Sequence, residues 1–254
     1  MKILAIGDLV GEIGLLKLKK NLENLQIAEK IDYTIVNSEN VSDGMGINTK
    51  DFNELNKLNI DTYTMGNHTW GKKDIFNFID TPKLIRPANY SKGVPGHGYY
   101  ITTKNDKKIA VIDLIGRTDM GVQSDNPFTT VDEILKNIEA DIIVVDFHAE
   151  ATAEKVAMGN YLDGRVTAMF GTHTHVQTAD ETILPNGTAY ITDIGMTGPK
   201  NSVIGMEIEA SLKRFVTSIP ERYRTARGDC MINGIVIEIN DSTCKAEKIY
   251  RINI

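Results

Sequence analysis

The feature that most restricts how this chain can fold is a series of short apolar runs rich in β-branched residues. They read KILAIG, DYTIVN, KIAVIDLIG, DIIVVDFH and RVTAMFG. Runs of this length, bounded by polar or turn-forming sequence, predict buried strands. Between the first two runs, leucines recur near the helical period at positions 15, 18, 22 and 25, and the helix-like segment EATAEKVAMGNYL separates the last two. The first part of the chain is therefore expected to alternate strand, helix and strand.

The later part of the chain predicts antiparallel pairs. The segment ETILPNGTAYITD predicts a hairpin around Pro185, Asn186 and Gly187, and NGIVIEINDSTCKAEKIYRI predicts a second hairpin around Asn240 and Asp241. A mixed α/β fold accommodates both kinds of pairing. We therefore expect two packed mixed β-sheets, a β-sandwich, with helices on the outside.

Residues 1–254 are interpreted as a single domain, because neither a low-complexity linker nor an internal repeat divides the chain. Two less regular stretches, RPANYSKGVPGHGYY and IGMTGPKNSVIG, contain clustered glycine, proline, serine and asparagine. This composition predicts loops, and loops commonly surround binding sites. The two stretches leave room for a small cap formed by loop insertions.

The composition is that of an ordinary water-soluble protein, with 41% hydrophobic and 24% charged residues. The formal net charge of −6 disfavours long duplex nucleic acid and anionic membranes as partners, although a local site could still hold a small anion. No run approaches the roughly 18 apolar residues of a membrane-spanning helix. The two cysteines, Cys230 and Cys244, lack a C-x-x-C spacing and predict reduced, buried thiols in a cytoplasmic protein.

Polar side chains that can bind a metal follow the ends of the predicted strands. Ligands of open α/β sheets bind beyond the carboxyl ends of the strands, so these side chains are expected to face one crevice. Within GTHTH, two histidines at positions i and i+2 of an extended segment project to the same face. The candidates are Asp8, Glu39, Asn40, Asn67, His68, His148, His173 and His175.

Each candidate alone has an ordinary structural explanation, such as a helix cap for Asp8, a turn for Asn40 or a satisfied core histidine for His148. Together they share position and chemistry, which favours a metal centre. A donor set of carboxylate, amide and imidazole without thiolate favours iron or manganese, with zinc, cobalt or magnesium as alternatives. There are too many donors for one ion. A shared carboxylate would hold two ions about 3.5–4 Å apart, as in phosphoryl transfer.

The order of an aspartate, a second acidic residue, GNH, a histidine and GTHTH resembles the calcineurin-like metallophosphoesterase superfamily. The details resemble its bacterial YmdB-type branch of cyclic-nucleotide phosphodiesterases. The resemblance spans Asp8 to His175 and implies two packed sheets and a dinuclear centre. It implies that Glu39 bridges the two ions. One ion would be bound by Asp8, Glu39, Asn40 and His175, and the other by Glu39, Asn67, His148 and His173.

Three departures from the superfamily pattern point to this branch. The usual Asp-x-His is Asp8-Leu9-Val10, so Asn40 is expected to replace the missing imidazole. The bridging acid is Glu39 rather than aspartate. The acidic residue that usually follows GNH is Thr69, which leaves open what orients His68.

The roles follow from charge. A hydroxide bridging two divalent ions is a nucleophile at neutral pH, because coordination lowers the pKa of water. His68, next to Asn67, is expected to protonate the leaving alkoxide as general acid. Arg117, which follows another apolar run, is a candidate for binding phosphate, with a surface ion pair as its alternative. Asp113 and Asp146 lie inside predicted strands and are interpreted as supporting residues rather than ligands.

Other functions compete with this one. A dinucleotide-binding domain is disfavoured because the glycines of GDLVGEIG do not form G-x-G-x-x-G. An amidohydrolase would carry H-x-H on its first strand, whereas here it follows residue 170. A phosphomonoesterase of the same fold and a non-catalytic nucleotide-sensing protein remain alternatives to the phosphodiesterase. The preference for 2',3'- or 3',5'-cyclic nucleotides is implied by the resemblance alone, and homo-oligomerisation is left open.

Overall fold

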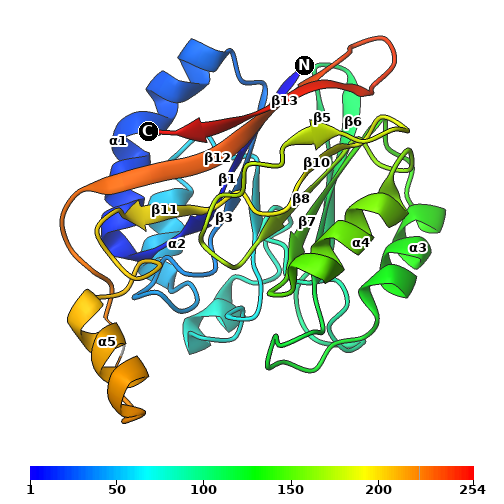
Figure 1. Ribbon diagram of the computed structural model, residues 1–254. Coiled ribbons are helices and arrows are strands. Elements are labelled where there is room, and N and C mark those ends of the chain that lie inside the picture. The colour runs from blue at the N-terminus through cyan, green and yellow to red at the C-terminus, as the bar shows by residue number, and fades with distance from the viewer. Residues whose placement is uncertain (223) are drawn as a thin grey trace.

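The computed structural model describes residues 1–222 and 224–254, and two β-sheets dominate it (Figure 1). In the first sheet, the strand order among these residues is β2-β11-β12-β1-β3-β4, and β13 also pairs with β12. Strands β1, β3 and β4 run parallel, whereas β12 is antiparallel to its partners. The strands are β1 (Lys2–Ile6), β2 (Asp8–Leu9), β3 (Tyr33–Asn37), β4 (Thr62–Thr64), β11 (Met196–Pro199), β12 (Cys230–Ile239) and β13 (Ala246–Asn253).

The second sheet has the order β5-β6-β7-β8-β10-β9. Its central strands β6, β7, β8 and β10 are parallel, and an antiparallel strand closes each edge. The strands are β5 (Tyr99–Lys104), β6 (Lys107–Ile115), β7 (Ile142–His148), β8 (Ala168–Thr172), β9 (Thr182–Ile183) and β10 (Ala189–Ile191). Both sheets are mixed, as the sequence predicts.

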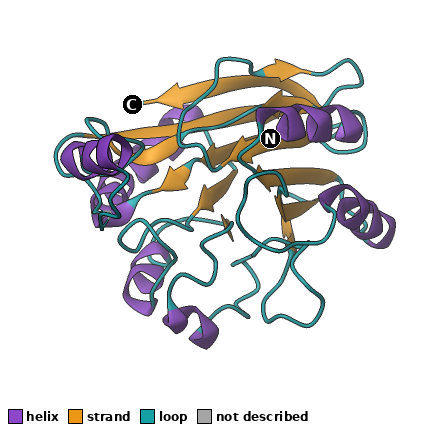
Figure 2. Cartoon of the chain, turned by 60° about the horizontal axis from the view of Figure 1, so that its bottom comes forward, coloured by secondary structure: helices purple, strands orange, loops and turns teal. Residues whose placement is uncertain are grey.

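Helices lie around the outside of the strands, as Figures 1 and 2 show. The leucines of α1 that recur at helical spacing are all buried in the cluster that also contains Leu4 and Ile6 of β1, which confirms the predicted helix. α5 projects from the rest of the fold (Figure 1). The helices are α1 (Gly11–Glu29), α2 (Thr49–Leu55), the 3₁₀ helix η1 (Lys73–Asn77), α3 (Pro127–Asn137), α4 (Thr152–Leu162) and α5 (Ile208–Thr217).

The layer between the two sheets is apolar. Ile3 and Ile35 of the first sheet pack in one cluster with Val111 and Val144 of the second, and all four side chains are buried. Burying apolar area is the main favourable term in folding, so this layer fixes how the sheets face each other. The expected fold of two packed mixed sheets flanked by helices is confirmed.

The local predictions agree with the structure at most places. β9 and β10 form the first predicted hairpin, β12 and β13 form the second, and α4 covers the predicted segment between β7 and β8. The expectation that IGMTGPKNSVIG is a loop throughout is wrong, because β11 lies inside it. β11 is held by long-range pairing with β2 and β12, which local composition does not reveal.

The two cysteines are more exposed than the sequence predicts. Cys230 and Cys244 are free thiols but are half-buried, which corrects the expectation that they are buried. Both lie near the ends of strands, where packing is incomplete.

Within the described ranges, the structure contains no helix that is long and apolar enough to cross a lipid bilayer.

A buried ion pair connects α4 to the second sheet. The Lys155 ammonium lies 2.7 Å from the Asp193 carboxylate, and both side chains are almost completely inaccessible to solvent. Asp193 also accepts hydrogen bonds from the backbone N–H and the hydroxyl of Thr174, at 3.1 and 2.7 Å. The pair therefore holds the segment that follows β8.

We predict that Lys155→Met lowers the free energy of unfolding of the metal-free protein by about 3–5 kcal/mol, because the buried Asp193 carboxylate loses its cation. Urea denaturation provides the measurement. Lys50→Met is the matched control. It breaks an ion pair with Glu12 in which both side chains are about 70% exposed, so it should have little effect on the free energy of unfolding. Equal stability of Lys155→Met and the wild type would show that the pair does not stabilise the fold.

Candidate metal centre

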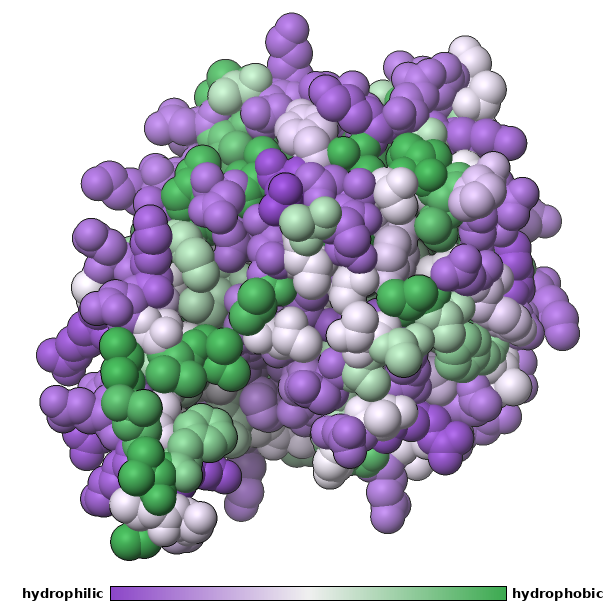
Figure 3. Space-filling view, in the orientation of Figure 1, coloured by the Kyte–Doolittle hydropathy of each residue, from purple (hydrophilic) through white to green (hydrophobic). Residues whose placement is uncertain are grey.

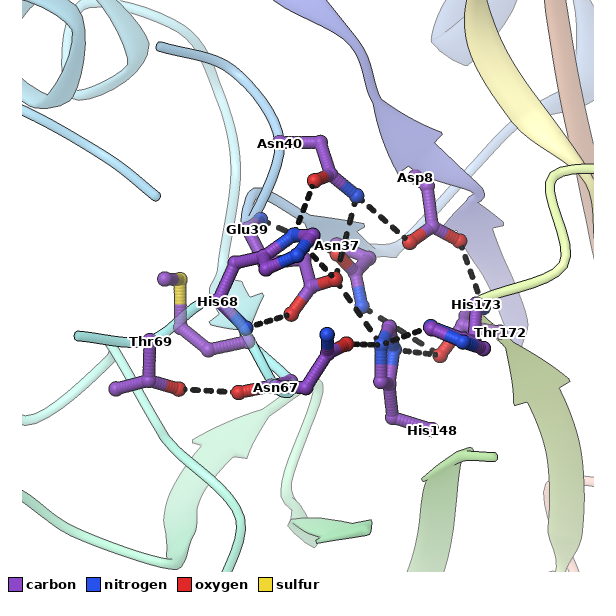
Figure 4. Close-up of polar contacts among 12 residues, drawn as sticks. Asp8, Asn37, Glu39, Asn40, Asn67, His68, Thr69, His148, Thr172 and His173 are labelled. Atoms are coloured by element: carbon purple, nitrogen blue, oxygen red, sulfur yellow. Dashed lines mark hydrogen bonds and ion pairs between the residues drawn. The ribbon is translucent and has the colours of Figure 1, made fainter. Parts of the chain in front are cut away.

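The candidate ligands come from both sheets and meet where neighbouring parallel strands end (Figure 4). In the first sheet, Asp8 follows β1, Glu39 and Asn40 follow β3, and Asn67 follows β4. In the second sheet, His148 is the last residue of β7. His173 and His175 follow β8.

One group of donors surrounds His148. Its Nε2 lies 3.0 Å from Glu39 Oε1, 2.9 Å from Asn67 Oδ1 and 3.0 Å from His173 Nδ1. One donor atom each from Glu39, His148 and His173 all lie within 4.8 Å of one another. These distances are short enough for one metal ion to contact all of these residues.

A second group lies on the other side of Glu39. The Asn40 amide nitrogen lies 3.4 Å from Asp8 Oδ1, 3.2 Å from His175 Nε2 and 3.2 Å from Glu39 Oε1. His175 Nε2 is 3.7 Å from Asp8 Oδ1. The buried Glu39 carboxylate therefore belongs to both groups, and the structure brings together all seven residues that the sequence suggested as ligands.

The three histidines are already oriented as metal ligands usually are. A histidine that binds a metal generally donates its other ring N–H to an acceptor, which fixes the ring. His175 Nδ1 lies 2.8 Å from the Ile204 carbonyl oxygen, and His173 Nε2 lies 3.1 Å from the Glu150 carboxylate. His148 Nδ1 lies 2.9 Å from the Thr172 hydroxyl. In each ring, the nitrogen that faces the centre is left to bind a metal, so the residues fit a metal site.

Asp146 supports this arrangement from beneath the centre. It is fully buried and accepts a hydrogen bond of 2.7 Å from Thr172, whose hydroxyl in turn contacts His148. Burial raises the pKa of Asp146 to about 6, although hydrogen bonds from Thr64 and Thr172 oppose the shift. Asp146 therefore contacts a candidate ligand through Thr172, as a supporting residue would.

The backbone around the H-x-H pair is unusual. His173 and His175 have φ angles of 103° and 65°, in the left-handed region that residues other than glycine rarely adopt. Two buried carboxylates hold this segment: Asp8 accepts the His173 N–H at 3.1 Å, and Asp193 accepts the Thr174 N–H. These hydrogen bonds offset the strain and aim both rings inward.

The glycine of GNH is required by close packing. A Cβ atom added to Gly66 would lie 2.3 Å from His148 Cδ2 and 2.4 Å from Glu39 Oε2. Contacts this short would displace two candidate ligands. Only glycine therefore allows the segment after β4 to approach the centre.

The charges at the centre are strongly coupled. Burial alone would lower the pKa of His148, but the adjacent Glu39 carboxylate overcomes burial and raises it to about 9. Burial would raise the pKa of Glu39, and the His148 and His68 charges reverse this and lower it. Burial and the His148 charge lower the pKa of His173 to about 3. In the metal-free protein, the proton is therefore held on His148, and His173 is neutral.

His68 lies beside this centre and is half-buried. Its Nδ1 is 2.8 Å from Asn40 Oδ1, and its backbone N–H donates to Glu39 Oε2 at 3.0 Å. Asn40 therefore orients the ring. Thr69 does not, because its hydroxyl donates to the Gly66 carbonyl oxygen at 2.6 Å.

A cavity of about 710 Å³ opens over the two groups of donors. Glu39, Asn40, His68, His173 and His175 contribute to its floor, and the other side is formed by residues around α5. Sequence reasoning missed Glu150 and Lys72, which also line the cavity. Glu150 lies only two residues after His148, in DFHAE, which is the local signal that could have identified it.

Arg117 is not brought to this cavity. It is exposed and lies beyond the end of β6, and its backbone N–H donates to the Glu154 carboxylate at 3.0 and 3.1 Å. The cationic residues that do line the cavity are Lys72, Arg214 and Arg222.

The chain is similar to known proteins over its whole length. It is 49% identical to the 2',3'-cyclic-nucleotide 2'-phosphodiesterase of Bacillus subtilis, and the match covers 100% of this chain and 97% of that protein. A crystal structure described as a novel phosphatase from Mycoplasma pneumoniae has a TM-score of 0.95 at 37% identity, covering 100% and 93% of the two chains. A hypothetical protein from Thermus thermophilus also has a TM-score of 0.95, at 35% identity, covering 100% and 99%.

A family match over nearly the whole chain supports the resemblance to the YmdB-type branch, which rests on a few sequence motifs. Residues 4–252 match the family described as YmdB-like protein. This range includes all of the second sheet, nearly all of the first and every candidate ligand. The chain therefore belongs to the YmdB-like family.

Proposed function

We propose that this protein hydrolyses a phosphodiester bond of 2',3'-cyclic nucleotides at the centre described above. The observation that carries the proposal is the arrangement of two groups of metal donors on either side of one buried carboxylate, Glu39. The activity named for the Bacillus subtilis relative supports the choice of substrate. Residues 1–254 would act as one unit, because both sheets supply donors. The two free cysteines support a cytoplasmic location as part of the proposal.

Two divalent ions would be held by the residues that already converge. Asp8, Glu39, Asn40 and His175 would bind one ion, and Glu39, Asn67, His148 and His173 the other. When bound, such ions polarise a phosphate and lower the pKa of water so that it can attack at neutral pH. The donor set favours iron or manganese over zinc, cobalt or magnesium.

Asn40 can support His68 through its amide oxygen, which lies 2.8 Å from His68 Nδ1. The Asn40 nitrogen now faces Asp8 and Glu39. An amide oxygen has two lone pairs, so after a rotation of the side chain the same oxygen could bind an ion and still accept the His68 Nδ1 proton. A protonated His68 would then carry its second proton on Nε2.

His68 Nε2 would donate the second proton of the imidazolium to the leaving group, which leaves His68 as a neutral imidazole. Cleavage of the bond between phosphorus and O2' leaves an alkoxide, which is a poor leaving group unless it is protonated. The product would be a 3'-nucleoside monophosphate, with the oxygen of water on phosphorus and the His68 proton on O2'. The half-buried position of His68 at the floor of the cavity suits this role.

A phosphomonoesterase is the second candidate, because the Mycoplasma pneumoniae relative is described as a phosphatase. A panel of cyclic nucleotides, linear phosphodiesters and phosphomonoesters, assayed with metal-reconstituted protein, separates the two functions. Turnover of phosphomonoesters alone would show that the protein is a phosphomonoesterase and not a phosphodiesterase. Chelator-insensitive binding without any turnover would favour the non-catalytic nucleotide sensor.

The state of His148 predicts that metal binding depends on pH. The raised pKa means that its pairing with Glu39 stabilises the metal-free protein fully below pH 6.5, and this contribution is lost as the pH rises through about 9. The metal must displace the same proton, so the apparent metal affinity should rise by about tenfold per pH unit up to that value. Calorimetry at pH 7 in buffers of different ionisation enthalpy should detect release of a proton. A metal affinity that does not change with pH would contradict this assignment.

Removing the shared carboxylate should empty both sites. We expect Glu39→Ala to retain neither ion after reconstitution and to lose the stabilisation that bound metal gives the folded state. Elemental analysis and thermal unfolding with metal are the measurements. Glu39→Asp is the control, since it keeps the charge and should bind both ions more weakly. If Glu39→Ala still held two ions, Glu39 would not be the bridging ligand. If the variant held one ion, Glu39 would be a ligand of only one site.

Replacing His68 should separate chemistry from metal binding. His68→Ala is expected to keep both ions and to lose about 10²–10⁴-fold in kcat on a cyclic nucleotide, the usual contribution of a positioned proton donor. The loss should be much smaller for an ester with a nitrophenolate leaving group, which departs without a proton. His97→Ala, which changes an exposed loop histidine, serves as the control. Equal losses on both substrates would mean that His68 only positions phosphate.

A further inference from the structure

One wall of the cavity is apolar, although its floor consists of metal donors. Among the residues that line the wall are Val203, Ile204 and Met206, which precede α5, and Phe215 of α5. Figure 3 shows hydrophobic side chains gathered over α5, in the part of the surface that projects at the lower left. An apolar wall opposite a polar floor is unnecessary for binding a phosphate group alone.

Phe215 is the most informative residue of this wall. Its side chain is 73% exposed, and it lines the cavity together with Ser211, which lies four residues earlier on the same face of α5. Exposing an aromatic ring to water costs free energy unless a partner covers it. Since the ring borders the same cavity as His68 and His175, a substrate held on the floor can reach it.

The wall is fixed relative to the metal donors. The Ile204 carbonyl oxygen accepts a hydrogen bond of 2.8 Å from His175 Nδ1, and Ile204 itself has a positive φ of 46°. The Met206 side chain packs near Gly44, since a Cβ atom on Gly44 would lie 2.7 Å from its Cε. The apolar wall is therefore attached to the site at one ligand and at the loop after β3.

We infer that Phe215, together with Ile204 and Met206 of the same cavity wall, binds the nucleobase of the substrate while the floor holds its phosphate. The inference rests on the proposed function and extends it to the recognition of the nucleoside. An aromatic ring stacks on any purine or pyrimidine, so this contact selects nucleotides over simple phosphoesters without selecting one base. Phe215 is a specificity residue here and takes no part in bond cleavage.

The test compares a 2',3'-cyclic nucleotide with its abasic analogue, 1-O-methylribose 2',3'-cyclic phosphate, using the full-length metal-loaded protein. Phe215→Ala should raise KM for 2',3'-cyclic AMP by about 5- to 100-fold, as expected for the loss of one stacked base, with little change in kcat. KM for the abasic analogue should stay the same. Phe215→Tyr keeps an aromatic face and should restore the low KM for the nucleotide.

Val216→Ala is the matched control. Val216 lies next to Phe215 on α5 and is 79% exposed, but it does not line the cavity. This variant should leave KM for both substrates unchanged. Equal effects of Phe215→Ala on the nucleotide and the abasic analogue, or no effect on either, would overturn the inference. A change of oligomeric state in Phe215→Ala without a selective rise in KM would also overturn it, by assigning the ring to a contact between subunits.

A binding measurement separates this inference from the proposed function. Calorimetry of 3'-AMP and of ribose 3-phosphate reports on the base contact even if the wild type cleaves neither cyclic phosphate. Tighter binding of 3'-AMP that is lost in Phe215→Ala and kept in Val216→Ala would support the base contact while the phosphodiesterase proposal fails. Equal binding of the two ligands by the wild type would overturn the base contact, whatever the turnover.

Discussion

The fold of this protein depends on how it compensates for carboxylates that are buried away from water. Asp8, Glu39, Asp113, Asp146 and Asp193 are all fully buried. A buried carboxylate is tolerated only when cations or hydrogen-bond donors compensate for its lost hydration. Glu39 faces His148, and Asp193 faces Lys155. Asp8 accepts the backbone N–H of His173, and Asp146 accepts the hydroxyls of Thr64 and Thr172. Among the described residues, Asp113 accepts only the backbone N–H of Met65 on one oxygen, and burial raises its pKa well above the usual range. Since these donors come from segments far apart in the sequence, the buried carboxylates help to position the loops at the strand ends.

The part of the site that could be predicted is the part encoded by local pattern. A buried strand followed at once by a polar residue is visible in the sequence, and parallel strands place their carboxyl ends together, so the convergence of Asp8, Glu39 and His148 follows from two local facts and one rule of topology. The H-x-H pair is also visible as a pattern. Its histidines nevertheless converge through positive φ angles and not through an extended segment, which spacing alone could not reveal.

The rest of the site required tertiary information. α5 has one buried side chain among those described, so its apolar residues do not face a core and its relation to the cavity is invisible in sequence periodicity. Asn40 is expected from the sequence to replace a missing imidazole, but its contact with His68 Nδ1 depends on how two loops from different strands approach each other. Arg117 follows a strand as the other candidates do. Its position beyond β6 and its contact with Glu154 nevertheless place it away from the cavity.

The division of the donors between the two sheets has a consequence for how this sequence can change during evolution. The distances from Glu39 to His148 and from Asp8 to His173 span the sandwich, so they depend on the thickness of the apolar layer that contains Ile35 and Val144. Replacing a residue of that layer by one of different volume shifts one sheet against the other, because interiors are densely packed. Selection for an intact centre therefore extends to hydrophobic positions that touch no donor, and we expect neutral variation to accumulate beneath the outer helices before it enters the layer between the sheets.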